Sequence, residues 1–146
     1  MKQFFAPLAL AAFIGCGSTA TATQTPGLTT SAIDATATQI DNGKKLYVEF
    51  CARCHGDAGQ GIDGAPPVVG AAAFPLAPRP GAKRDVQFHT AADVFAWTIK
   101  HMPGDAPGSL ATDQYLAIFA FDLTANGVKL SHPLDGALAA TIVLHP

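Results

Sequence analysis

The chain has 146 residues, of which 49% are hydrophobic and 14% charged, and its formal net charge is -2. This length is that of one compact domain with some additional chain, and the hydrophobic content excludes a wholly disordered protein. A chain without a basic surface cannot neutralise phosphates, so we expect no nucleic acid among its partners. Three cysteines are too few for a disulfide-rich scaffold. The composition therefore predicts a small globular domain whose cysteines have a specific role.

Residues 1–15 have the pattern of a secretory signal peptide, because one basic residue precedes a short apolar run. The run ends in the tetrapeptide Phe-Ile-Gly-Cys at Cys16, which resembles the bacterial lipobox, where the cysteine becomes acylated. We therefore predict a lipoprotein anchored to a membrane through Cys16. The following Gly17 resembles lipoproteins that are sorted to an outer membrane. Simple cleavage near Ala22 is the alternative, and both predict a protein that works in the periplasm.

Residues 16–38 are dominated by threonine and alanine, and Asp34 is the single charged residue among them. They show neither the helical nor the strand period of apolar residues. The segment is therefore predicted to be a flexible tether, which would let a folded head sample positions above a membrane surface.

The centre of the chain carries a C-x-x-C-H motif, formed by Cys51, Cys54 and His55. This is the attachment site for c-type haem. The two thiols reach two vinyl groups on one edge of a porphyrin, and the histidine that follows points its imidazole at the iron. A thioredoxin-like site is usually set between strands, and a structural zinc site needs four ligands. A disulfide would leave His55 unexplained, so the predicted cofactor is one haem c, bound through two thioethers.

Apolar periodicity predicts three helices, over residues 40–50, 91–100 and 112–125. The first would begin at an N-cap formed by Asp41 or Asn42, and the last would end at the C-cap signal of Asn126 and Gly127. Between residues 56 and 70, glycine and proline recur too often for regular structure, which predicts a loop wrapped around a large object.

With Gly56 after the motif, a Gly-Ala-Pro-Pro segment ending at Pro67, and Met102 followed by proline, the chain resembles the class I monohaem cytochrome c family, particularly its bacterial members. The resemblance covers residues 40–127. It implies a small all-α cytochrome c fold, in which three to four helices and long Gly/Pro loops surround a covalently bound haem.

The resemblance also implies a domain over residues 39–128, in which the last helix crosses the first. The crossing would place Gly43 and Tyr47 against Phe119 and Ala120. Glycine at such a crossing lets two helices approach closely.

The axial ligands implied by the resemblance are His55 and Met102, and the carbonyl group of Pro66, or failing that Pro67, would accept a hydrogen bond from His55. The family often has glycine before this methionine, whereas this chain has His101. Ligation by His101 therefore stays open as the alternative, and it would give a bis-histidine haem of lower potential.

Three further residues are candidates for contacts with the haem propionates. Arg79 and Arg84 could donate charge-assisted hydrogen bonds to these anionic groups, although solvated surface charge is the commoner role of an arginine. Trp97 could donate its indole N–H, and core packing is its other interpretation.

With both axial positions filled, such a haem implies a carrier of single electrons by outer-sphere transfer, rather than an enzyme. Its partners would be redox proteins, periplasmic or membrane-bound. A second hypothesis is a haem c subunit of a periplasmic dehydrogenase or terminal oxidase, for which the apolar residues 138–144 of the C-terminal tail, 129–146, would be a docking strip. A third is a haem enzyme or gas sensor with an open iron site.

Overall fold

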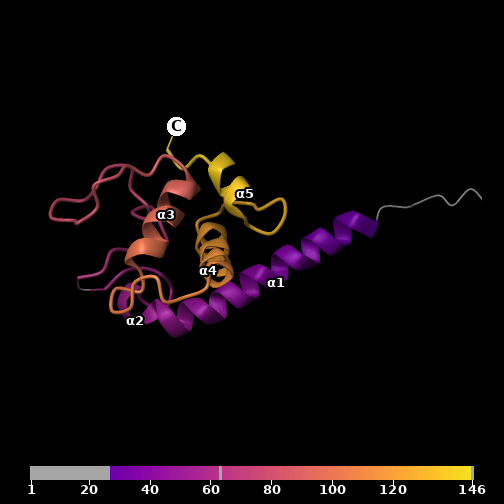
Figure 1. The fold of residues 1–146 in the computed structure, drawn as a ribbon, viewed down its shortest axis with the longest axis horizontal. Helices are drawn as coiled ribbons and strands as arrows, with labels where there is room; N and C mark the ends of the chain where they lie inside the picture. The colour runs from indigo at the N-terminus through magenta and orange to yellow at the C-terminus, as the bar shows by residue number, and fades with distance from the viewer. Residues whose placement is uncertain (1–26, 63, 146) are drawn as a thin grey trace, which may run out of the picture.

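In a computed structural model, which describes residues 27–62 and 64–145, the chain forms five α-helices joined by long loops (Figure 1). They are α1 (Gly27–Phe50), α2 (Ala52–His55), α3 (Ala91–His101), α4 (Thr112–Ala125) and α5 (Gly136–Thr141). The described residues form isolated bridges but no strand. This confirms the all-α prediction, with five helices in place of the three to four expected, because the motif and the tail each form a short helix of their own.

Helix α4 occupies the centre of the fold, where it packs against both α1 and α3, while α5 packs against α3 (Figure 1). None of the helices within the described ranges is both long enough and apolar enough to cross a membrane. The predicted signal peptide and the positions Cys16, Gly17 and Ala22 lie outside the described residues.

Helix α1 begins at Gly27 rather than at residue 40, so the prediction of a flexible tether is wrong for residues 27–38. Threonine hydroxyls in this stretch bond to carbonyl groups one turn earlier, as from Thr36 to Ala32 at 2.8 Å. Asp41 and Asn42 therefore lie inside the helix and do not cap it. In Figure 1 the first half of α1 extends beyond the other helices.

Helices α1 and α4 cross with their backbones in contact. A Cβ atom on Gly43 would lie 1.8 Å from the carbonyl oxygen of Ala117, so only glycine fits there. Tyr47 is buried, and its ring packs against Phe121 with the centroids 5.4 Å apart. The predicted contact with residues 119–120 is wrong. Gly43 meets Ala117 and Ile118 instead, and Phe119 and Ala120 belong to the larger core cluster described next.

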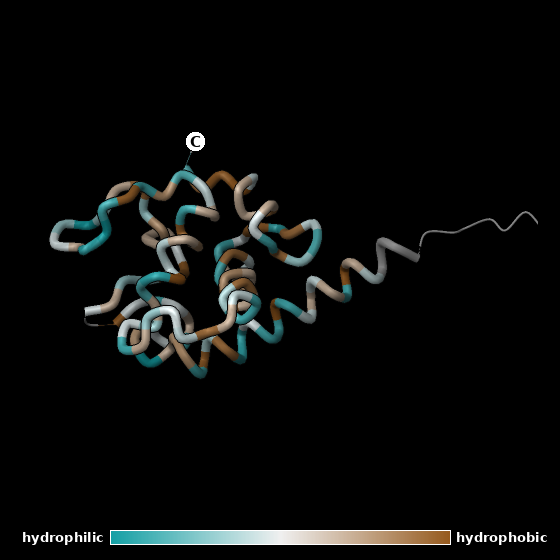
Figure 2. The backbone as a smooth tube through the Cα atoms, in the orientation of Figure 1, coloured by the Kyte–Doolittle hydropathy of each residue, from teal (hydrophilic) through white to brown (hydrophobic). Residues whose placement is uncertain are grey.

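The core is divided into two clusters on the two sides of α4. The smaller is centred on Tyr47, Ala52 and Ile118. The larger joins α3, α4 and the chain end, and its buried members are Phe88, Ala91, Val94, Phe119, Ala120, Leu123, Leu134 and Ala139. Figure 2 shows that α4 and the chain after α5 are largely hydrophobic.

The C-terminal tail belongs to this core. Asp135 caps α5 by accepting a hydrogen bond from the backbone of Leu138 at 2.7 Å. After the helix, the carbonyl group of Ile142 accepts from the backbone N–H of Ala91 at 2.9 Å, which fastens the chain end to the start of α3. Residues 138, 142 and 144 pack against the larger cluster. The apolar run of the tail is therefore part of the domain itself.

Candidate haem site

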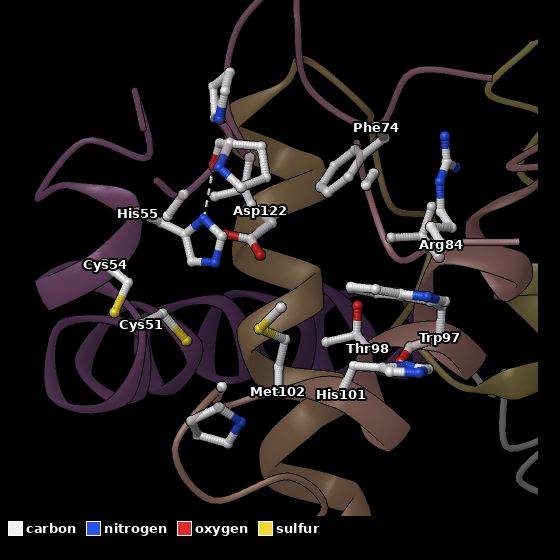
Figure 3. Close-up of a pocket in the computed structure, with 18 of the residues that line it drawn as sticks. Cys51, Cys54, His55, Phe74, Arg84, Trp97, Thr98, His101, Met102 and Asp122 are labelled. Atoms are coloured by element: carbon white, nitrogen blue, oxygen red, sulfur yellow. Dashed lines mark hydrogen bonds between the residues drawn. The ribbon is translucent and has the colours of Figure 1, made fainter. Parts of the chain in front are cut away.

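A cavity of about 810 Å³ lies between α2, α3, α4 and the long loops. Cys51, Cys54 and His55 line it on one side and Met102 on the other (Figure 3). Much of the remaining wall is apolar, and it includes Phe74, Phe88, Val94, Leu110, Ile118 and Phe119. The structure thus brings the motif and the predicted methionine, which are distant in sequence, to the same cavity.

The two cysteines flank the short helix α2. Cys51 is its N-cap and is partly buried, Cys54 lies within it and is exposed, and both thiols are free. Burial, together with the nearby carboxyl group of Asp122, raises the pKa of the Cys51 thiol to about 12. The backbone N–H of His55 donates to the carbonyl group of Cys51 at 2.9 Å, so one helical turn holds all three motif residues together.

His55 is buried, and its ring is oriented by the loop that follows. Its Nδ1 lies 2.7 Å from the carbonyl oxygen of Pro66, to which it donates a hydrogen bond. Pro66 rather than Pro67 is therefore the partner. A proton on Nδ1 leaves the lone pair on Nε2 free to bind a metal ion, and the ring faces the cavity (Figure 3).

Met102 follows α3 directly as its C-cap. Its backbone N–H donates to Thr98 at 2.8 Å, and its carbonyl group accepts from the hydroxyl of Tyr115 at 2.6 Å. The thioether points into the cavity towards His55 (Figure 3). His101 also lines the cavity, but it is exposed and its ring is stacked on Trp97, with the ring centroids 4.4 Å apart.

Of the three residues predicted to contact the propionates, Arg84 and Trp97 each have an unpaired donor, whereas Arg79 is bonded within the chain. Arg84 is buried over the ring of Phe88, and its Nη2 donates to Pro75 at 2.7 Å. Its Nη1 and the indole Nε1 of Trp97 are buried without a partner, and both residues line the cavity. Arg79 also lines the cavity, but its guanidinium donates to the carbonyl group of Ala72.

Asp122 is a residue of the site that the sequence analysis did not identify. It lies on α4, lines the cavity, and its Oδ1 is buried without a hydrogen-bond partner. Burial raises the pKa of this carboxyl well above its ordinary value. A signal was available, since Asp122 follows Ile118 by four residues and therefore shares its buried face.

The residues present fit a haem. Unpaired buried donors are rare in native proteins, and Arg84 and Trp97, which both line the cavity, each carry one. His55 offers a free imidazole nitrogen, Met102 a thioether, and two free thiols stand beside them. The donor set is that of a c-type haem with histidine and methionine ligation.

A family model described as cytochrome C oxidase, cbb3-type, subunit III, matches residues 38–121. The chain belongs to this family of c-type cytochrome domains. It therefore carries a covalently bound haem c and functions in electron transfer. The prediction of a cytochrome c family is confirmed.

The cytochrome is also similar to a solved structure, the sulfane dehydrogenase SoxCD from Paracoccus pantotrophus. The two share 28% sequence identity with a TM-score of 0.55, over 72% of this chain and 52% of the other. The cytochrome thus spans about half the length of the chain that it matches. Among curated proteins, none matches it.

Proposed function

We propose that this cytochrome carries single electrons between redox proteins in the periplasm, through a haem c that is attached to Cys51 and Cys54 and ligated by His55 and Met102. The observation that carries the proposal is that the His55 ring and the Met102 thioether face the same cavity, beside both thiols (Figure 3). When bound there, the haem supplies a ferric–ferrous couple whose potential is raised by methionine ligation.

The chain's own residues would hold and tune this group. Pro66 orients His55 and makes it a stronger electron donor, because its carbonyl group accepts the Nδ1 hydrogen. Arg84 and Trp97 would donate their unpaired N–H groups to the propionates. The apolar walls exclude water, which lowers the local dielectric constant. If His55 and Met102 both hold the iron, no position on it would be left for a substrate.

The location outside the cytoplasm rests on the sequence of residues 1–17. A signal peptide followed by a lipobox-like cysteine supports export and acylation at Cys16, and Gly17 supports the outer membrane. Such an anchor would hold the cytochrome near membrane-bound donors and acceptors, which raises its effective concentration there. Transient partners of this kind meet across small interfaces.

A second candidate function, a haem subunit of a larger oxidoreductase, is favoured by the similarity to a chain of a sulfane dehydrogenase. The docking strip first considered for it packs in part against the domain's own core, through residues 138, 142 and 144, while Val143 is exposed. Co-purification with a large partner at high salt would support this function. A haem-loaded protein that stays monomeric under the same conditions would argue against it.

The deciding experiment is an optical spectrum of the matured, haem-loaded protein, recorded oxidised, reduced, and reduced with carbon monoxide. A low-spin spectrum with the weak near-red ferric sulfur–iron band, unchanged by carbon monoxide, is the expected result. A high-spin spectrum or prompt carbon monoxide binding would contradict the proposed function as an electron carrier. It would indicate an open iron site, as in a haem enzyme or gas sensor.

A further inference from the structure

Helix α4 is hydrogen-bonded to the proposed ligand Met102 on one side of the site, and on the other side to the loop that orients the proposed ligand His55. In its first turn, Tyr115 donates its hydroxyl hydrogen to the carbonyl oxygen of Met102 at 2.6 Å. At its other end, the C-cap residue Asn126 binds residues 66–70, which we call the proline loop. Its Nδ2 donates to the carbonyl oxygen of Val68 at 2.8 Å, and its Oδ1 accepts from the backbone of Gly70 at 2.9 Å.

The proline loop depends on such external contacts because it contains no regular structure of its own. Its first residue, Pro66, accepts the hydrogen bond from His55. The loop is held on one side by Gly59, whose carbonyl group accepts from the two valines that follow the prolines, at 2.8 and 2.9 Å. On the other side it is held by Asn126. The Asn126 amide also donates to the carbonyl group of Asp122 at 2.8 Å, so it is fixed relative to α4.

The methionine side has a corresponding arrangement. Met102 lies in the turn after α3, and its carbonyl group accepts from the backbone of Gly108 at 3.2 Å as well as from Tyr115. Tyr115 is 3% exposed, so its ring is held by the core. Without the hydroxyl group, only the longer of these two bonds would remain on the carbonyl oxygen.

We propose that Asn126 and Tyr115 are a pair of positioning residues, through which α4 sets the placement of His55 and Met102, respectively. The inference rests on the proposed function, since it assumes that these two side chains are the ligands. Asn126 would act on the strength of the His55 ligand, because the bond to Pro66 increases the basicity of the imidazole. Tyr115 would make the Met102 thioether harder for another ligand to displace from the iron.

The two roles predict different effects in the haem-loaded full chain. Tyr115→Phe is expected to raise the affinity of the ferric protein for imidazole about fivefold, as one hydrogen bond is lost on the methionine side. Loss of the sulfur–iron band reports this binding. Asn126→Ala is expected to leave that affinity within about twofold. It should instead raise the reduction potential, because a less basic imidazole stabilises ferric iron less.

Hydrogen exchange supplies a readout that is independent of the iron. Asn126→Ala should accelerate exchange of the backbone amides in residues 68–70, whereas Tyr115→Phe should not. The matched control is Thr124→Ala on the same helix, because Thr124 is exposed and, among the described residues, its hydroxyl bonds only to the carbonyl group of Ala120 in α4. This control should change neither the potential, nor imidazole binding, nor exchange of the proline loop.

Several outcomes would overturn the inference. It fails if both variants behave like Thr124→Ala, or if both shift imidazole binding and potential in the same proportion, as a general loss of stability would do. If Asn126→Ala does not mature, the second variant is Asn126→Asp, which keeps the acceptor for Gly70 and loses the donor to Val68. Unchanged exchange of the backbone amides in residues 68–70 of this variant would also contradict the proposal. A wild-type protein without the sulfur–iron band would instead contradict the proposed function.

Discussion

The imidazole ring of His101 is stacked on the indole ring of Trp97, with their planes 14° apart. Its Nδ1 donates to the carbonyl oxygen of Trp97 at 2.7 Å, one helical turn earlier. These two contacts hold His101 along α3, while the next residue, Met102, leaves the helix with its thioether in the cavity (Figure 3). The arrangement favours Met102 over His101 as the second axial ligand.

Met102→Ala should therefore keep the covalent haem but lower the reduction potential, because a thioether ligand stabilises the ferrous state. The variant should also bind carbon monoxide in its ferrous form. His101→Ala is the matched comparison, and it should retain the sulfur–iron band. Potentiometry with optical detection measures both. An unchanged potential in Met102→Ala would assign the ligand to His101 instead.

The chemistry of the site could be predicted from sequence because it is local. Cys51, Cys54 and His55 lie within one helical turn, so their spacing alone brings them together. Met102 and Pro66 are distant from the motif, and their assignment depended on the resemblance to a family. The hydrogen bond from His55 to Pro66 is present in the structure, and ligation by Met102 stays a prediction.

The extent of α1 could not be predicted because its first half, which extends beyond the other helices, has no apolar period (Figure 1). Just after this stretch, Gln39 exchanges two hydrogen bonds with the backbone of Leu134, at 2.7 and 2.9 Å. These partners are 95 residues apart in the chain. Asp122 was missed although its spacing of four residues from Ile118 places it on the same buried helix face. Only the structure shows that this residue also lines the cavity.

Replacing both motif cysteines, as in Cys51→Ala with Cys54→Ala, should abolish covalent haem and leave the domain largely unfolded. The reason is that the cavity of about 810 Å³ lies at the centre of a small core, and empty apolar space is strongly destabilising. Haem staining of a denaturing gel and far-ultraviolet circular dichroism measure the two effects. A double variant that is well folded without haem would contradict this prediction.

The start of α3 predicts a dependence of stability on pH. Thr90 and Asp93 form a capping box, in which the Asp93 carboxylate accepts from the backbone and hydroxyl of Thr90 and from the backbone of His89. The backbone bond from Thr90 is the main cause that lowers the pKa of Asp93 in the folded state. The stabilisation is therefore present above the unfolded pKa of about 3.9, and it is lost as the pH falls through the lower folded value.

Asp93→Ala should accordingly reduce the free energy of unfolding by about 1 kcal/mol at neutral pH, which is typical of a lost helix cap. The difference between variant and wild type should shrink at pH values below the folded pKa of Asp93. Urea unfolding of the haem-loaded proteins, followed at neutral and at acid pH, measures it. A difference that stays constant down to acid pH would show that the carboxylate charge has no part in the cap.

The crossing of α1 and α4 predicts the result of adding one methyl group. Gly43→Ala would place a Cβ atom 1.8 Å from the Ala117 carbonyl oxygen and 2.4 Å from its carbon, and neither can move without shifting α4. Overpacking of this kind costs about 1–3 kcal/mol in unfolding free energy. Gly136→Ala is the control, since a Cβ there meets nothing within 4 Å. Both residues are helical, so helix propensity favours alanine in each. A Gly43→Ala protein as stable as the Gly136→Ala protein would mean that the two helices are not in backbone contact.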